Sequence, residues 1–237
     1  MNRPKDICSW WCAALATVAL CVPSSAQTHI SILWLGNSYI SDHMAGPLLN
    51  NAVMDLINEG HDSGLTDIVV DSSVVNSLWS QGLQSHWYDF TSMEKATSGG
   101  YDYVVLQGYV LTDDSVTMVN SADVTIQYAA LFADTVRASG SIPLVFCAHP
   151  RCDATPAMWE YTLDAYEAAA DSARAEFAPA AVAWRNALDE DSTFELYQGD
   201  CIHQNANGIY LYAAVFYSVF TGLSIEGHPS LSFGPTF

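Results

Sequence analysis

The stretch ILWLGNSYI, from Ile32 to Ile40, decides the fold of this chain of 237 residues. Its apolar residues give way to a Gly-Asn-Ser tripeptide, a pattern typical of a buried strand that runs into a tight turn. Gly36 allows a tight turn, and Asn37 tolerates backbone angles that other residues avoid. Ser38 is therefore predicted to lie just beyond the strand, with its hydroxyl above the edge of the sheet.

Apolar, β-branched runs recur along the chain and predict five strands, at Ile30–Leu35, Asp67–Val75, Tyr101–Gln107, Ile142–Ala148 and Ala180–Trp184. Segments with helical periodicity occupy Met44–Glu59, His86–Ala96, Ala122–Ser139, Thr155–Phe177 and Asn207–Phe220. Continuous apolar strands that alternate with helices form parallel sheets covered on both faces. The sequence thus predicts an α/β fold, a three-layer α/β/α sandwich whose strands end at one edge, where such sheets bind ligands.

A second motif, GDCIHQNANGIYLYAAVFY from Gly199 to Tyr217, places Asp200 and His203 on a loop that opens a helix. An aspartate three residues before a histidine can fold back and accept a hydrogen bond from the imidazole Nδ1, which leaves Nε2 free to take a proton from serine. The two motifs together predict a nucleophile, Ser38, with His203 as its base and Asp200 as the orienting carboxylate. Each motif alone also fits a simple helix cap.

These residues resemble the end blocks of the SGNH hydrolase superfamily, the GDSL-type esterases and lipases. Gly36, Asn37 and Ser38 match its Gly-Asn-Ser variant, while Asp200 and His203 match its Asp-x-x-His block, which precedes the closing helix. The resemblance spans nearly the whole chain after residue 26. It implies a single domain over residues 27–237, with the flavodoxin-like SGNH fold and a five-stranded parallel sheet.

The middle blocks of the family supply an oxyanion hole. The stretch SLWSQGLQSHW, from Ser77 to Trp87, is similar to the block whose glycine donates a backbone N–H, which assigns that role to Gly82 beside the N–H of Ser38. The third donor in the family is an asparagine side chain, whereas VVLQGY offers Gln107, which carries the same amide on a longer side chain.

The resemblance implies a serine hydrolase that cleaves acyl or acetyl esters, including esters on carbohydrate, through a serine-ester intermediate and without a cofactor. The altered third block leaves open a non-catalytic binding module with the same fold. An acyltransferase with the same triad is a further alternative. The histidines outside the motif show no spacing with cysteines or carboxylates that indicates a metal site, so we expect no metal.

Residues 1–26 have the pattern of a signal peptide. Arg3 and Lys5 precede the apolar run from Cys12 to Val22, which is short for a membrane span, and small residues end at Ala26, after which we expect cleavage. We therefore expect a secreted or periplasmic protein with no membrane span after cleavage. An uncleaved anchor is the alternative, and a lipoprotein site at Cys21 is a weaker one.

Export would leave three cysteines, Cys147, Cys152 and Cys201, in a compartment that permits disulfides. Cys152 follows a predicted strand and Cys201 lies beside Asp200, so both are expected at the same edge of the sheet. We hypothesise a Cys152–Cys201 bridge, with three free thiols as the alternative.

The charge of the chain restricts its partners. The formal net charge is −19, and removal of residues 1–26 takes away Arg3, Lys5 and Asp6, which changes it to −20. Such a surface repels polyanions, so nucleic acid and anionic lipid are disfavoured as partners. A small-molecule or glycan ester remains as the expected partner.

Overall fold

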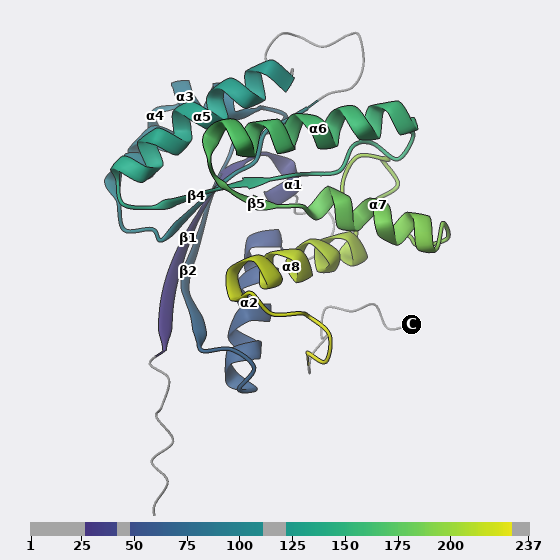
Figure 1. The fold of residues 1–237 in the computed structure, drawn as a ribbon, viewed down its shortest axis with the longest axis horizontal. Coiled ribbons are helices and arrows are strands. Elements are labelled where there is room, and N and C mark those ends of the chain that lie inside the picture. The colour runs from purple at the N-terminus through teal and green to yellow at the C-terminus, as the bar shows by residue number, and fades with distance from the viewer. Residues whose placement is uncertain (1–26, 42–47, 111–121, 229–237) are drawn as a thin grey trace, which may run out of the picture.

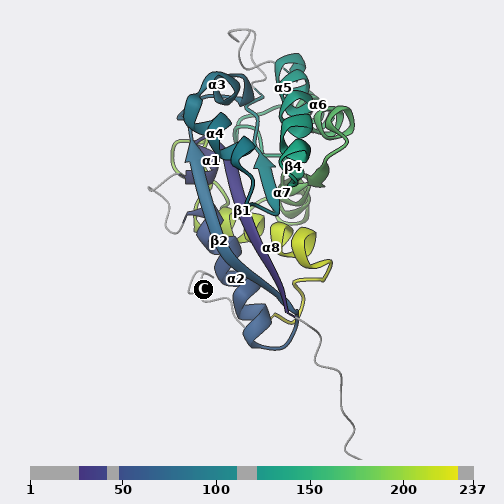
Figure 2. The same ribbon diagram turned by 90° about the vertical axis from the view of Figure 1, so that its left-hand side faces the viewer.

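Five parallel strands form the centre of the computed structural model, which describes residues 27–41, 48–110 and 122–228. The strands follow the order β2-β1-β3-β4-β5 across the sheet (Figures 1 and 2). Their bounds are β1 Thr28–Gly36, β2 Ile68–Ser77, β3 Tyr103–Leu106, β4 Ile142–Phe146 and β5 Glu176–Ala178. This arrangement confirms the predicted five-stranded parallel sheet.

Helices cover both faces of this sheet, as Figure 1 shows. One face packs against α3 (Leu83–Tyr88), α4 (Phe90–Ser98), α5 (Ala122–Ala138) and α6 (Pro156–Ala173). The other face packs against α2 (Leu49–Asp62), α7 (Ala180–Glu190) and α8 (Ala206–Thr221), while the single turn α1 (Ser38–Ser41) follows β1 directly. The predicted three-layer α/β/α sandwich is therefore confirmed.

Strand β1, which lies between β2 and β3, is buried on both faces, as its continuous apolar sequence predicts. Ile32 and Trp34 face the α2 and α8 layer, whereas Leu33 and Leu35 face the α5 and α6 layer, because successive side chains of a strand point to opposite sides. The Trp34 indole N–H donates to Ser73 Oγ at 2.9 Å. Each of these side chains stabilises the fold by about 1.5–3 kcal/mol through burial.

The fifth strand lies earlier in the chain than the sequence predicted. The expected strand at Ala180–Trp184 is wrong, since these residues begin α7, and β5 is a three-residue strand that ends before Pro179. The side chains of Ala180, Ala181 and Trp184 are all buried, a spacing that fits one helix face and not an alternating strand.

Two helix predictions also need correction. The helix expected to run from Thr155 to Phe177 ends at Ala173, where Arg174 adopts a left-handed conformation with φ of 47°. The helix expected at His86–Ala96 is divided into α3 and α4, because the Asp89 side chain accepts a hydrogen bond from the Ser92 N–H and starts a new helix.

The expected signal peptide, residues 1–26, lies outside the described residues. No helix in the described ranges is long and apolar enough to cross a membrane.

Candidate active site

The carboxyl ends of the strands meet at one edge of the sheet and bring the predicted site residues together. Gly36 at the end of β1 pairs in register with Ser77 at the end of β2, and Leu35 pairs with Leu106 at the end of β3. The loops that leave these strands therefore emerge side by side. They carry Ser38, Gly82 and Gln107, in that order along the chain.

Ser38, His203 and Asp200 form a continuous chain of hydrogen bonds at this edge. Ser38 Oγ lies 2.8 Å from His203 Nε2, and His203 Nδ1 lies 2.5 Å from Asp200 Oδ2. Because a carboxylate only accepts, Nδ1 carries the ring proton and Nε2 is the acceptor for the serine hydroxyl. The predicted nucleophile, base and carboxylate are thus placed in the order that proton transfer from Ser38 requires.

Asp200 is held in its position by the backbone of its own loop. Its Oδ1 accepts hydrogen bonds from the N–H groups of Ile202 at 2.9 Å and His203 at 3.0 Å. Partial burial works to raise the pKa of Asp200, but the hydrogen bonds from the His203 ring and from these two N–H groups outweigh it and lower the pKa to about 2. The carboxylate is therefore ionised at neutral pH and stabilises a positive charge on the imidazole.

The Gln107 side chain supports the backbone of the turn that carries Ser38. The Asn37 N–H donates to Gln107 Oε1 at 2.9 Å, and Gln107 is fully buried. Gly36 is required here because of close packing: a Cβ at this position would lie 2.6 Å from Gln107 Oε1 and 2.4 Å from Ile40 Cδ1. Asn37 has no positive φ, so the predicted reason for this residue, an unusual backbone angle, is wrong.

Asn37 instead joins the turn to its neighbours through its side chain. Its Oδ1 accepts from the Tyr39 N–H at 3.1 Å, and its Nδ2 donates to the Gln81 carbonyl at 3.1 Å. The second bond ties the Ser38 turn to the loop that ends at Gly82.

Gln107, the predicted third oxyanion donor, makes hydrogen bonds inside the protein. Both ends of its buried amide are engaged within the protein, since Oε1 accepts from Asn37 and Nε2 donates to the Gly108 carbonyl. The carbonyl of Gly108 also accepts from the Tyr166 hydroxyl at 2.9 Å. Gln107 thus supports the turn in this structure, and its role as an oxyanion donor stays a prediction.

Two backbone donors remain in the predicted oxyanion hole. The N–H of Ser38, at the start of α1, and the N–H of Gly82, at the N-cap of α3, have no hydrogen-bond partner within the described part of the chain. Their loops are held together by the Asn37–Gln81 bond and by a second bond, from the Leu78 N–H to the Gly36 carbonyl at 2.9 Å. Unpaired backbone N–H groups are the kind of donor that stabilises a negative oxygen.

His86 is a buried support for the same turn. Its Nε2–H donates to the Gly36 carbonyl at 2.8 Å, and its Nδ1 lies 2.7 Å from Ser92 Oγ. Burial lowers the pKa of His86, and the hydrogen bond to Gly36 and the charge of Asp89 oppose this only in part. His86 is therefore neutral at pH 7 and acts through its geometry.

A second buried histidine, His149, supports the loop that carries His203, a role that the sequence did not reveal. Its Nε2–H donates to the Ile202 carbonyl at 2.9 Å, its Nδ1 accepts from the Tyr212 hydroxyl, and its ring stacks on Trp184 with centroids 3.7 Å apart. Burial lowers the pKa of His149 to about 3, and the bond to Ile202 offsets this only in part. A polar residue after an apolar strand was the only signal in the sequence.

The hypothesised bridge between Cys152 and Cys201 is present, and the third cysteine of the described chain, Cys147, is a buried free thiol. Arg151, next to the bridge, is exposed and pairs with Asp153 at 3.0 Å. The described residues contain no group of three histidines, cysteines or carboxylates arranged to hold a metal.

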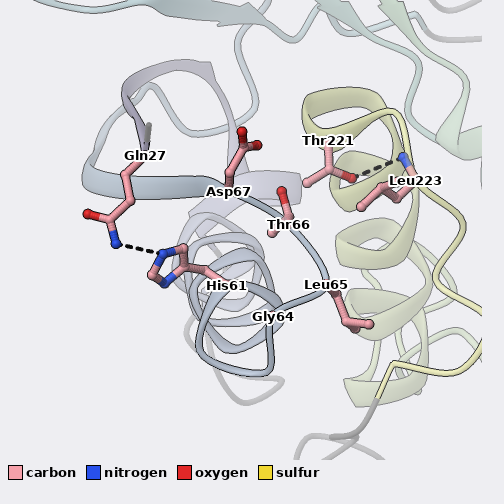
Figure 3. Close-up of a pocket in the computed structure, with 8 residues that line it drawn as sticks. All are labelled: Gln27, His61, Gly64, Leu65, Thr66, Asp67, Thr221 and Leu223. Atoms are coloured by element: carbon pink, nitrogen blue, oxygen red, sulfur yellow. Dashed lines mark hydrogen bonds between the residues drawn. The ribbon is translucent and has the colours of Figure 1, made fainter. Parts of the chain in front are cut away.

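A cavity of about 560 Å³ lies at the opposite edge of the sheet (Figure 3). Gln27, which precedes β1, lines it together with His61 and Asp67, and Gln27 Nε2 lies 2.9 Å from His61 Nε2. This cavity is thus separated from Ser38 by the length of β1.

Comparison with solved structures identifies the fold as that of SGNH hydrolases and esterases. A predicted SGNH hydrolase from Slackia heliotrinireducens superimposes with a TM-score of 0.62 at 19% identity, over 81% of this chain and 100% of that one. An acetyl xylan esterase from Geobacillus stearothermophilus gives 0.58 at 12% identity, over 82% and 95%. The esterase EstA from a Pseudoalteromonas species gives 0.52 at 12%, over 81% and 96%. No protein-family profile matches the sequence, and the search of curated proteins found no relative.

Proposed function

We propose that this chain is an SGNH-type serine hydrolase that cleaves carboxylic esters. The observation that carries the proposal is the hydrogen-bonded sequence Ser38–His203–Asp200, with Oγ–Nε2 and Nδ1–Oδ2 distances of 2.8 and 2.5 Å. The site lies at the carboxyl edge of a parallel sheet, where folds of this class bind ligands. The similarity to SGNH hydrolases and esterases, although it concerns the fold, agrees with this chemistry.

In the first half-reaction, Ser38 Oγ attacks the ester carbonyl carbon while its proton moves to His203 Nε2. Asp200 stabilises the resulting imidazolium through Nδ1. The negative charge that develops on the carbonyl oxygen is stabilised by the N–H groups of Ser38 and Gly82. Loss of one such donor typically raises the barrier by about 3–4 kcal/mol. The intermediate then expels the alcohol, which takes the proton from His203, and leaves an acyl group on Ser38.

In the second half-reaction, His203 removes a proton from water, and the hydroxide attacks the acyl carbonyl carbon. The same two N–H groups stabilise the second oxyanion. Collapse of this intermediate breaks the bond to Ser38 Oγ, which regains its proton from His203, and releases the carboxylic acid. The cycle uses only residues of this chain and water.

The proposed substrate is a small acyl ester, such as an acetyl group on carbohydrate, that the protein meets outside the cytoplasm. The signal-peptide pattern of residues 1–26 supports export. The negative charge of the chain disfavours polyanionic substrates, and one of the similar structures is an acetyl xylan esterase.

Chromogenic acetate esters test the proposal. We expect turnover by the wild-type chain and a loss of more than about 1,000-fold in kcat for Ser38→Ala and for His203→Ala. Wild-type turnover by both variants would refute the triad. A fluorophosphonate should label Ser38 in the wild type only, whereas an unlabelled wild type would favour a binding module. Transfer of the acyl group to an acceptor sugar faster than to water would identify an acyltransferase.

A further inference from the structure

Cys201, in the loop between Asp200 and His203, is attached to Cys152 in the loop after β4. Its side chain is joined to Cys152 by a disulfide, with the two Cα atoms 5.0 Å apart. Its carbonyl accepts a hydrogen bond from the Cys152 N–H at 3.0 Å. The Cys201 N–H also donates to the Gln198 carbonyl at 3.1 Å. One covalent bond and two backbone hydrogen bonds thus fix Cys201, one of the two residues between the proposed carboxylate and the proposed base.

The backbone of Cys201 adopts a conformation that the bridge can maintain. Its φ of 65° is in the left-handed region, which costs a residue with a Cβ about 1–2 kcal/mol. Such strained residues persist when the surrounding structure over-determines them, and they cluster at functional sites. At Cys201 the left-handed turn folds the chain back so that the Asp200 carboxylate accepts from the N–H groups of Ile202 and His203 and from the His203 ring.

Other contacts hold the rest of this loop independently of the bridge. His149 donates to the Ile202 carbonyl at 2.9 Å, and Gln198 donates to the His203 carbonyl at 2.7 Å. The Gln204 amide donates to the Tyr39 carbonyl at 2.6 Å and connects the loop to the Ser38 turn. Cleavage of the disulfide should therefore loosen Cys201 and the adjacent Asp200, which would keep only hydrogen bonds, while His203 stays near Ser38.

We propose that the Cys152–Cys201 bridge is a positioning element for Asp200, so that full activity of this site requires the oxidised form. The expected loss of kcat rests on the proposed function, whereas the expected loss of the Asp200–His203 contact rests on the loop geometry alone. A dithiol reductant would supply two electrons and two protons, become a cyclic disulfide itself, and convert the bridge into two thiols. Asp200 would then lose its fixed contact with His203 Nδ1.

The kinetic test compares the oxidised and the reduced protein on a chromogenic acetate ester. We expect dithiothreitol to lower kcat by about 100-fold, the effect of misplacing a catalytic group by about 1 Å, with KM unchanged. Reoxidation should restore kcat. The variant Cys147→Ala should respond in the same way, because it removes the free thiol and keeps the bridge.

The variant Asp200→Asn tests whether the bridge acts by positioning Asp200 or by supporting the fold as a whole. If the bridge acts through Asp200, reduction should cause little further loss of kcat in this variant, because effects on one coupled unit are not additive. An equal fold-loss in Asp200→Asn and in the wild type would overturn the proposal. So would a reduced protein that has lost its helical circular dichroism, since the bridge would then maintain the fold as a whole.

A proton NMR measurement tests the geometry without turnover. The hydrogen-bonded Nδ1–H of His203 should give a low-field signal in the oxidised protein that is absent from Asp200→Asn. We expect this signal to disappear on reduction, and its persistence would overturn the inference. A protein that shows the signal and its loss, yet cleaves no ester, would instead refute the proposed function alone.

Discussion

Acidification should destabilise the protein through His149, the histidine that supports the loop of His203. The ring is 2% exposed, its Nε2–H donates to the Ile202 carbonyl, and burial lowers its pKa to about 3, from the ordinary value of 6.5. Because the unfolded chain binds a proton at this histidine more readily than the folded chain, the free energy of unfolding falls as the pH falls below 6.5, until about pH 3. One pH unit corresponds to about 1.4 kcal/mol, so the expected loss between pH 7 and pH 5 is about 2 kcal/mol.

Urea unfolding at pH 7 and pH 5 measures this loss for the wild type and for His149→Gln. Glutamine can still donate to the Ile202 carbonyl, but it does not titrate and does not stack on Trp184. We expect the variant to be less stable at pH 7 and to show a dependence on pH that is weaker by about 2 kcal/mol over this interval. His86, whose pKa is also lowered by burial, contributes equally to both proteins, and Asp200 with a pKa of about 2 stays ionised. Equal pH dependence in the two proteins would refute the assignment of the effect to His149.

Three further substitutions test the site. Gly36→Ala should lower the free energy of unfolding by about 1–3 kcal/mol and also lower kcat. The reason is that the new Cβ would lie 2.4 Å from Ile40 Cδ1 and displace the Ser38 turn. Unchanged urea unfolding and unchanged turnover would contradict this packing. Gln107→Ala should lower the free energy of unfolding by about 2–4 kcal/mol, since it opens a cavity and leaves the Asn37 N–H unpaired. A loss of kcat without a loss of stability would instead support Gln107 as an oxyanion donor. Asp200→Asn should lower kcat by up to about 10⁴-fold with little change in KM, and steady-state kinetics that show a change in KM alone would oppose its role.

The sequence predicted the layers of the fold because the buried strands have a simple signal. Residues Ile32–Leu35 are apolar without interruption, and only a strand covered on both faces requires this. The fifth strand was missed because Glu176–Ala178 is too short to show a pattern, while Ala180–Trp184 contains small and apolar residues that suit a strand or a helix equally well. Its identity as a helix depends on the tertiary packing of Trp184, which periodicity over five residues cannot reveal.

The positions of Ser38, Asp200 and His203 could be predicted, whereas the reasons for their neighbours could not. A short motif indicates which residue types meet. The need for glycine at position 36, however, comes from the close approach of Gln107, which follows β3, and of Ile40 in α1. The support that Gln107 gives to the turn was missed for the same reason. Its longer side chain reaches the Asn37 N–H, and this contact depends on how β1 and β3 are aligned.

Buried polar side chains near the site share one property that links stability to the proposed chemistry. His86, Gln107, His149 and Gln204 each hydrogen-bond to a backbone group of a loop that carries Ser38 or His203. Burial of a polar group is costly unless it is paired, so these side chains are stable only while the loops keep their positions. The Gln204–Tyr39 bond connects the two loops directly, so the Ser38–His203 distance depends on a buried amide. The His203–Asp200 distance depends on the exposed side of the loop, where the disulfide lies. The two halves of the triad therefore have separate supports, which is why we expect reduction to affect one half and leave the other in place.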